Sequence, residues 1–422
     1  MRSHYKRIGD YVTLVKLKNS DGAISSLKGI NINKHFMPSV ANVNGTDLST
    51  YRVVKKNQFA FNPMHVGRDE VLPISMLEDD EPIIVSPAYV VFEVKDEEEL
   101  LPAYLMMWCR RSEFDRNAWF MTDNSVRGGF SWTDFCDMEL PIPSIEKQRE
   151  IVREYNVVND RIALNEQLTQ KLEDTAQALY KQWFVDFEFP ISKEYAESIG
   201  KPELEGKPYK SSGGEMSYIE SMGIEAPTCW LIEPLSQLVV EKTPITYGVV
   251  KPGPVDSLNG VPFIRSGDIK NGYIETSELR TITQEVSNQY KRTLLSGGEL
   301  LIALVGNPGA VALVPEALKG ANIARQVGLI KIGDRALSIY VKHYISSFSG
   351  KDALNDIIGG SVQQVINLDS LRQLNILIPD SSTLDNYFSL VDSSELFFSN
   401  IQSMIDALQN LREVLLTQLV RG

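Results

Sequence analysis

The sequence is poor in the residues that usually carry catalytic or metal chemistry. Its three cysteines form no CxxC pair and its four histidines are scattered, so neither a zinc ribbon nor a thioredoxin-type centre is expected. Unpaired cysteines and the lack of an apolar leader favour the cytoplasm, and no apolar run reaches the ~18 residues that a membrane span needs. The cysteines are Cys109, Cys136 and Cys229, and the histidines are His4, His35, His65 and His343.

The sequence motifs of common enzyme classes are also missing. The chain has no GxxxxGK[ST] phosphate loop, no HExxH and no GxSxG, which argues against an ATP-driven motor, a zinc protease and a serine hydrolase. Residues 62–65 (Asn-Pro-Met-His) are similar to the Asn-Pro-Pro-aromatic motif of amino-methyltransferases, but they lack its second proline and its stacking ring. No glycine-rich cofactor loop accompanies them. We therefore expect a chain that is not an enzyme and that holds no cofactor and no metal.

Acidic residues outnumber basic ones, but the two are unevenly distributed. The net charge is −13, yet residues 1–60 carry +7, residues 61–143 carry −11 and residues 228–379 carry +1. Neutralisation of phosphates supplies most non-specific affinity for DNA. The isolated chain should therefore bind DNA weakly, and partner subunits would have to supply positive charge.

An internal repeat organises the chain. Residues 124–143 (NSVRGGFSWTDFCDMELPIP) align without a gap with residues 360–379 (GSVQQVINLDSLRQLNILIP), at an offset of 236. Upstream, residues 57–62 resemble residues 298–303, and residues 83–92 resemble residues 321–330. Each is a short apolar run after a polar turn, which is typical of a β-strand. The shared order predicts a duplicated domain of mixed helix and strand.

A long helix is predicted after each of the two Ile-Pro pairs that end the repeat. Residues 144–189 and 380–421 contain no glycine or proline, and their apolar residues recur every three or four positions, as in a coiled coil. Each helix would be about 60 Å long, and Asn165 would fix the register of the seam. The other copy is the economical partner for such a seam, although each helix packing on its own domain is the alternative. The seam residues expected to serve pairing and partner docking are Ile151, Tyr155, Ile162, Leu168, Leu172, Leu179, Trp183, Phe398, Ile401, Leu408, Leu411 and Leu415.

The predicted fold class is α+β, with two pseudo-repeated mixed α/β domains separated by two long antiparallel coiled-coil-like helices. The first domain is expected at residues 1–143 and the first helical region at 144–190. Residues 191–227, rich in Lys, Glu, Ser, Gly and Pro, are expected to form a linker. The second domain is expected at 228–379 and the second helical region at 380–422.

Polar and basic residues on turns beside apolar strands are candidates for contacts with DNA. Arginine reads guanine through two hydrogen bonds, and asparagine or glutamine reads adenine. In the first domain these residues are Lys28, Asn31, Asn33, Lys34, His35, Asn62, His65, Arg68 and Arg127. In the second domain they are Thr246, Tyr247, Lys251, Arg265, Ser266, Asn271, Lys291, Arg292, Asn307, Arg325, Gln326, Gln363 and Gln364. Arg68, Arg127, Tyr247, Gln363 and Gln364 are the strongest of them.

Several segments resemble the specificity subunits of type I restriction–modification systems, over nearly the full chain. They include YKRIGDYV, FNPMHVGRDEVLPI, SVRGGFSW, LPIPSIEKQREIV, ALYKQWFVDFEFP, VPFIRSGDIKNGYI and GGELLIALVGNPG. Proline followed by a long heptad helix, which occurs twice, is the most specific element, and KQWFVDFEFP is nearly as specific. The second helix begins with STLDNYF in place of a KQRE-like start, so the partner contacts there are less defined.

This resemblance implies a non-catalytic subunit that reads a bipartite target on double-stranded DNA, one half-site per domain. It implies that the helical regions dock methyltransferase subunits, two of them, which bind S-adenosylmethionine and methylate adenine. It also implies that motor–nuclease restriction subunits, which use ATP, join for cleavage. Two other readings stay open: a scaffold whose helices join two protein-binding domains, and a free-standing DNA methyltransferase. Sequence-dependent protection of DNA would exclude the scaffold, and S-adenosylmethionine binding by the isolated chain would favour the methyltransferase.

Overall fold

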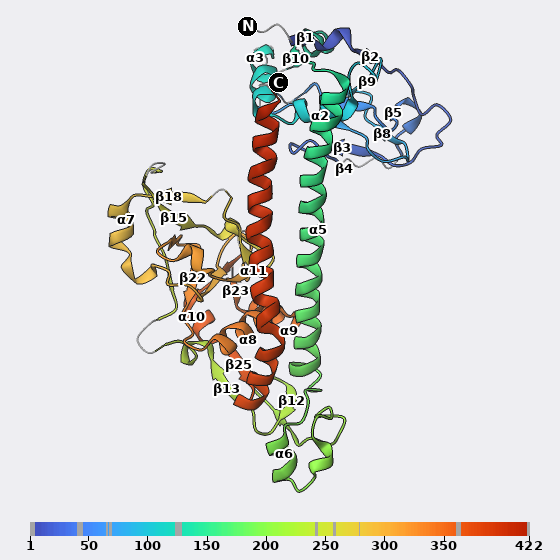
Figure 1. Ribbon diagram of the computed structural model, residues 1–422. Helices are drawn as coiled ribbons and strands as arrows, with labels where there is room; N and C mark the ends of the chain where they lie inside the picture. Colours follow the sequence, from blue (N-terminus) through green and yellow to red (C-terminus); the bar gives the residue numbers. More distant parts are fainter. Residues whose placement is uncertain are drawn as a thin grey trace. The chain divides into compact units, whose positions relative to one another are not determined.

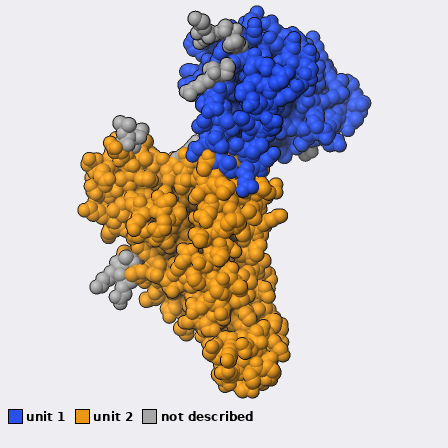
Figure 2. All heavy atoms as spheres, in the orientation of Figure 1, with its two compact units in different colours: residues 1–161, 408–422 blue, residues 162–407 orange. Residues whose placement is uncertain are grey.

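The computed structural model describes residues 5–39, 45–64, 66, 70–122, 129–240, 244–255, 259–277, 279–359 and 364–419. The chain divides into two compact units, which Figure 2 colours separately. Unit 1 contains residues 1–161 and 408–422, and unit 2 contains residues 162–407. Both units include parts of two long helices, α5 (Ile145–Phe184) and α11 (Ser381–Gln418).

Unit 1 is built on an antiparallel sheet with the strand order β2-β9-β6-β7. Phe59 lies opposite both Phe92 and Met76 in its register, and the rings of Phe59 and Phe92 stack at 4.8 Å between centroids. These side chains lie in a core that the unit's helices also line. The elements are β1 (Tyr5–Arg7), β2 (Val12–Leu14), β3 (Lys28–Ile30), β4 (Phe36–Pro38), β5 (Arg52–Val54), β6 (Phe59–Phe61), β7 (Ile74–Met76), β8 (Ile83–Val85), β9 (Val90–Val94), α2 (Pro102–Cys109), α3 (Ser112–Met121), α4 (Trp132–Asp137) and β10 (Glu139–Pro141).

Unit 2 contains a second antiparallel sheet, with the strand order β14-β22-β19-β20. Leu300 lies opposite both Ile330 and Leu313, and the strands share a core with helices of the same unit. The elements after residue 228 are β13 (Leu231–Pro234), β14 (Thr246–Tyr247), β15 (Val261–Ile264), β16 (Ile269–Lys270), β17 (Tyr273–Ile274), β18 (Arg280–Ile282), α7 (Gln284–Gln289), β19 (Leu300–Ala303), β20 (Val311–Leu313), β21 (Asn322–Ile323), β22 (Val327–Ile330), α8 (Arg335–Ser346), α9 (Phe348–Ile357), β23 (Ile358–Gly359), β24 (Val365–Ile366), α10 (Leu368–Arg372) and β25 (Asn375–Ile378).

The two sheets show that the chain is duplicated. The order β2-β9-β6-β7 matches β14-β22-β19-β20 strand for strand, and the ladder β1-β10 matches β13-β25. The helices follow in the same sequence, α2 to α5 in one copy and α8 to α11 in the other. Strands β6, β9 and β10 lie in three of the aligned segments, and β19, β22 and β25 lie in their counterparts. The predicted α+β fold class, with two similar mixed domains and two long helices, is confirmed.

The long helices pair antiparallel inside each unit (Figure 1). In unit 2, Thr169 of α5 accepts a hydrogen bond from Gln402 of α11 at 3.1 Å, and Trp183 packs on Tyr387 at 5.7 Å. In unit 1, Tyr155 shares a core with Leu416 and Leu419. None of the helices within the described ranges is long and apolar enough to cross a membrane.

Residues 191–227, for which the sequence predicts a linker, are ordered and belong to unit 2. They form α6 (Lys193–Ser198) and the hairpin of β11 (Met216–Ile219) and β12 (Ile224–Pro227). Phe189 stacks on Tyr209 at 4.6 Å and on Trp230 at 5.2 Å, so aromatic packing anchors this polar segment. The polar composition of this segment predicted a linker, but its few aromatic side chains pack into a core and give it a defined structure.

Candidate nucleic-acid interface

A cleft of about 860 Å³ opens on the surface of unit 2. Three segments of the second domain form it: the chain around β14, the ends of β19 and β22, and the turn from β24 into α10. Aliphatic side chains and polar or charged side chains line it together. The residues that line it are Tyr247, Val250, Leu304, Val305, Arg325, Gln326, Val365, Ile366, Asn367, Leu368, Asp369 and Arg372.

Backbone hydrogen bonds fix the three segments of the cleft. The N–H of Arg325 donates to Val249 at 3.0 Å, and the N–H of Leu304 donates to Gln326 at 2.8 Å. The N–H of Ile366 in turn donates to Leu304 at 2.9 Å. A Cβ atom at Gly248 would lie 1.8 Å from the carbonyl oxygen of Ile323, so only glycine allows this close approach.

Three residues predicted to contact DNA meet at this cleft: Tyr247, Arg325 and Gln326. All three are exposed, and Tyr247 is 48% exposed. Arginine can bind phosphate or guanine, glutamine can read adenine, and a tyrosine ring can stack on a base. The cleft therefore brings together three side chains of types that can contact DNA.

The cleft also contains residues that the sequence did not single out. Arg372 donates to the carbonyl oxygen of Ile245 at 2.6 Å and pairs with Asp369 at 2.6 Å, so its guanidinium stabilises the wall. Asn367 is exposed, and its side chain caps α10 by accepting from the N–H of Asp369 at 2.8 Å. The letters Asn-Leu-Asp were a recognisable cap signal, but a cap signal says nothing about the cleft around it.

The other second-domain candidates that the structure describes do not line this cleft. Arg265 is held by Asp268 at 2.8 Å, and Asn271 forms a tight turn at φ 45° between β16 and β17. Gln363 lies outside the described residues. Lys251, Lys291, Arg292, Asn307 and Gln364 are exposed, whereas Thr246 and Ser266 are half-buried.

The prediction that Lys34 of the first domain contacts DNA is wrong, because this side chain is buried. Its side chain is only 5% exposed, its Nζ pairs with Asp115 at 2.8 Å and donates to the carbonyl oxygen of Cys109, and it lies 4.8 Å from the centre of the Phe114 ring. A lysine held in this way stabilises the core and is not available to phosphate. The sequence did not reveal this because a lysine on a turn usually faces solvent.

The remaining first-domain candidates lie on turns, in strand β3 or outside the described residues. Asn31 accepts from the N–H of His35 at 2.9 Å and so closes the turn between β3 and β4. Asn62 caps the chain after β6 by accepting from the N–H of Met64 at 3.0 Å. His65, Arg68 and Arg127 lie outside the described residues; Lys28 is half-buried and Asn33 is exposed.

The predicted helix seam lies mostly inside the protein. Tyr155, Ile162, Trp183, Phe398 and Ile401 are buried, and Ile151, Leu168, Leu172, Leu179, Leu408 and Leu415 are half-buried, whereas Leu411 is exposed. The buried ones serve the pairing of α5 with α11. A second apolar set in unit 2 faces solvent at a spacing of seven residues, and we call Leu390, Phe397 and Met404 the outer stripe of α11.

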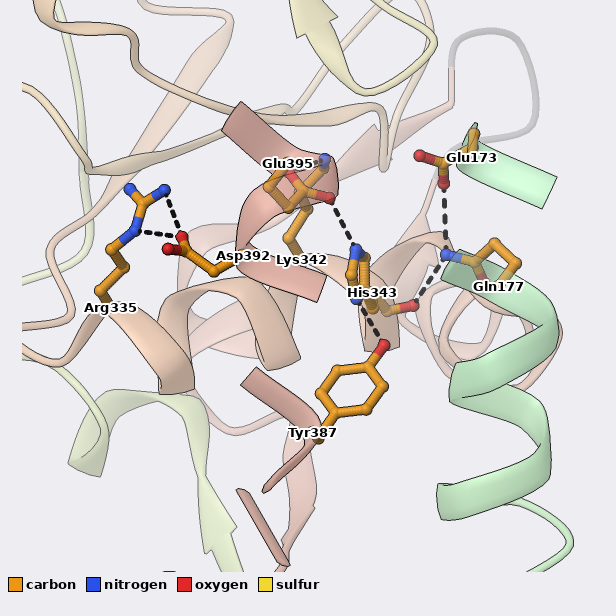
Figure 3. A network of polar contacts seen from close by, with 8 residues as sticks. All are labelled: Glu173, Gln177, Arg335, Lys342, His343, Tyr387, Asp392 and Glu395. Carbon is orange, nitrogen blue, oxygen red and sulfur yellow. Dashed lines mark hydrogen bonds and ion pairs between the residues drawn. The ribbon is translucent and has the colours of Figure 1, made fainter. Parts of the chain in front are cut away.

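Among the residues that the structure describes, no group of three or more His, Cys, Asp or Glu side chains is arranged to hold a metal ion. The buried acid–base contacts of unit 2 instead join Lys342 and His343 of α8 to Glu395 of α11 (Figure 3). No sequence pattern indicated this group, because Glu395 lies about 50 residues from the two others in the chain.

Comparisons with known proteins point to one class. No protein-family profile matches the chain. It is 23% identical over 434 residues to the HindI type I restriction enzyme specificity subunit of Haemophilus influenzae, across 92% of this chain and 91% of that protein. It is 24% identical over 294 residues to the EcoBI specificity subunit of Escherichia coli, across 68% of this chain and 58% of that protein, so it spans less than two thirds of the E. coli relative.

A solved structure supports the fold. The crystal structure of the type I restriction–modification S subunit from M. genitalium aligns with 98% of this chain and 95% of its own, with a TM-score of 0.52 at 10% sequence identity. The resemblance to type I specificity subunits that the sequence motifs predict is confirmed.

Proposed function

We propose that this chain is the sequence-specific DNA-binding specificity subunit of a type I restriction–modification complex. The observation that carries the proposal is the duplication: the same sheet order and the same helix order occur twice in one chain. Two copies of one reading domain suit a target made of two half-sites. The similarity to type I specificity subunits supports the same function.

The cleft of unit 2 is the proposed reading surface of the second domain. Tyr247 would stack on or pack against a base, and Gln326 and Arg325 would form hydrogen bonds to base edges or phosphates. The first domain repeats the local fold, because the N–H of Phe130 donates to Pro63 at 2.9 Å just as that of Ile366 donates to Leu304. Asn62, next to Pro63, is therefore the described residue of unit 1 that we assign to the corresponding surface.

The chemistry of the complex would belong to its partners. We propose that two methyltransferase subunits dock on the long helices and that motor–nuclease subunits join for cleavage, so that this chain is not itself catalytic. The outer stripe of α11 supports docking, because exposed apolar side chains at a spacing of seven fit a partner helix. Such a complex would act on cellular DNA, which places it in the cytoplasm.

Reconstitution with methyltransferase subunits tests the proposed function. We expect the mixture to bind one bipartite sequence with an affinity that falls steeply with salt, and to methylate adenine in it. The isolated chain should neither transfer methyl groups nor bind DNA strongly. Methyl transfer by the chain alone would contradict the proposal, and a complex that forms without any sequence preference would favour the scaffold.

A further inference from the structure

Three basic side chains from distant parts of the sequence gather on unit 1. His35 lies on the turn before β4, Arg110 caps the end of α2, and Arg412 lies in the last turns of α11. Partial burial lowers the pKa of His35, and the charges of Arg110 and Arg412 lower it further, whereas Glu78 raises it. The two arginines are therefore close enough to His35 to repel its charged form.

The acids beside these arginines compensate them only weakly. Arg110 meets Glu78 at 3.7 Å between Nη2 and Oε1, and its Nε is buried without a hydrogen-bond partner in the described part of the chain. Arg412 meets its neighbour Glu413 at 3.8 Å between Nε and Oε1. Both distances are too long for a hydrogen bond, and the side chains of the two acids are 67% and 66% exposed, so these ion pairs contribute little. The guanidinium groups therefore keep most of their capacity to donate hydrogen bonds.

The donors of this cluster suit an anion with several oxygens. Arginine can donate two parallel hydrogen bonds to phosphate, and a protonated imidazole adds a further donor. The turn that carries His35 also exposes Ile32 and Asn33, so a large ligand can approach it. This turn belongs to residues 1–60, whose net charge of +7 favours a polyanion such as DNA over a single carboxylate.

We propose that His35, Arg110 and Arg412 form a phosphate site on unit 1, at which the last turns of α11 complete the DNA-binding surface of the first domain. This inference rests on the proposed function, which supplies DNA as the polyanion. A phosphate contact positions DNA without reading its sequence. The helix whose outer stripe is proposed to dock methyltransferase subunits would therefore also hold the DNA backbone.

A bound phosphate opposes the effect of the two arginines on His35. The charged groups that face His35 are Arg110, Arg412 and Glu78. Because repulsion by the arginines lowers the pKa of His35 in the free chain, phosphate that neutralises them raises this pKa, and binding takes up a proton. The affinity for DNA should thus rise as the pH falls from about 7.5 to about 6, the range in which histidine ordinarily titrates.

The experiment titrates the full complex with a target duplex and with an unrelated duplex, at salt concentrations from about 50 to about 200 mM. Arg412→Gln is the main variant, because the side chain of Arg412 is 34% exposed and its only ion pair is weak among the described residues. We expect this variant to weaken binding of both duplexes by a similar factor, to reduce the slope of log K against log salt by about 0.9, and to leave the methylated sequence unchanged. Arg412→Lys keeps the charge and should keep the slope.

Arg116→Gln is the matched control. It removes the same charge from the same unit, at a side chain of α3 that is 72% exposed and meets Glu113 at 3.4 Å, and it should leave the salt slope unchanged. His35→Gln is the second variant. It should abolish most of the gain in affinity that the native complex shows at low pH.

A folded Arg412→Gln complex with the native salt slope would overturn the inference. If Arg412→Gln does not fold, His35→Gln decides, and a native pH dependence in that variant overturns it as well. Inorganic phosphate is also titrated into the complex without DNA. Phosphate binding that requires Arg412 while the DNA slope stays native would assign the site to free phosphate, and loss of methyltransferase capture with native DNA binding would assign it to an acidic side chain of the partner; either result contradicts a DNA site.

The two proposals fail in different ways. A native complex without any sequence preference would contradict the proposed function. Because a phosphate contact does not depend on sequence, binding of the unrelated duplex still tests the site in that case.

Discussion

At the scale of single residues, burial decides whether a charged side chain serves folding or recognition. Burial lowers the pKa of Lys34 and raises that of its partner Asp115, in each case against the attraction of the pair. At Glu395, burial raises the pKa, but Lys342 and His343 outweigh it and hold the pKa at about 2. Of the two lysines, only Lys34 was singled out in the sequence, and it was predicted to contact DNA.

The low pKa of Glu395 predicts a pH-dependent contribution to stability. Its ordinary value is 4.5, so the stabilisation is complete above that pH and is lost as the pH falls towards 2. The groups that face it are Lys342, His343 and Tyr387. Glu395→Gln should cost ~3–5 kcal/mol of unfolding free energy at pH 7, because it leaves Lys342 unpaired in the core. Urea unfolding of both chains from pH 7 to pH 3 measures this, and a difference that does not shrink with acid would contradict the assignment.

Tyr247 gives a residue-scale prediction for DNA recognition. Replacing Tyr247 with alanine should weaken specific binding by ~1–3 kcal/mol, because the ring would no longer stack or pack at the cleft. Tyr218, on the hairpin after α6, is 65% exposed and provides the matched control. Titration of both variants with target and unrelated DNA distinguishes the cases. Equal losses at the two tyrosines would remove the cleft from the reading surface.

At the scale of elements, the sequence predicted the repeated strands and the long helices, because both follow from periodic apolar residues. The joint between α8 and α11 was not predictable, since Lys342, His343 and Glu395 meet only after folding. The packing of Tyr209 and Trp230 on Phe189 was not predictable for the same reason, so a linker was predicted for residues 191–227. Three residues of the cleft were predicted to contact DNA because of their residue types. Asn367 and Arg372 were not singled out, since the side chain of Asn367 caps α10 and that of Arg372 bonds to the backbone of Ile245.

The outer stripe of α11 yields a prediction about subunit assembly. Phe397→Ser should reduce capture of the methyltransferase subunits at least ~10-fold, because Phe397 is 49% exposed at the centre of the stripe and an apolar anchor of this kind contributes most of the energy of an interface. Phe348→Ser, at an exposed position of α9, is the control for the loss of a surface phenylalanine. Co-purification of tagged chains measures both. Normal assembly of the Phe397 variant would move the docking surface elsewhere.

At the scale of the whole molecule, each half of the duplication should read DNA independently. Exchanging residues 1–143 for those of a relative should change one half-site and leave the other intact, as shown by mapping methylated adenines. Helix α5 must still fit the new domain, because Gln148 of α5 bonds to that domain. Its side chain accepts a hydrogen bond from the N–H of Leu101 at 2.9 Å and donates one to the carbonyl oxygen of Glu99. A hybrid with Gln148→Ala controls for this joint. A simultaneous change of both half-sites would contradict independent reading.

Unit 1 joins segments from opposite ends of the sequence, and this has a consequence for biosynthesis. Leu416 and Leu419 complete the core that Tyr155 and the first domain begin. Domains usually fold as they leave the ribosome, the N-terminal one first. We therefore expect the core of unit 1 to be completed only after residues 416–419 have been translated, whereas unit 2 ends at residue 407 and can fold earlier. The first domain to be synthesised is therefore the last to mature, and a premature stop codon after residue 407 would harm the domain encoded at the start of the gene.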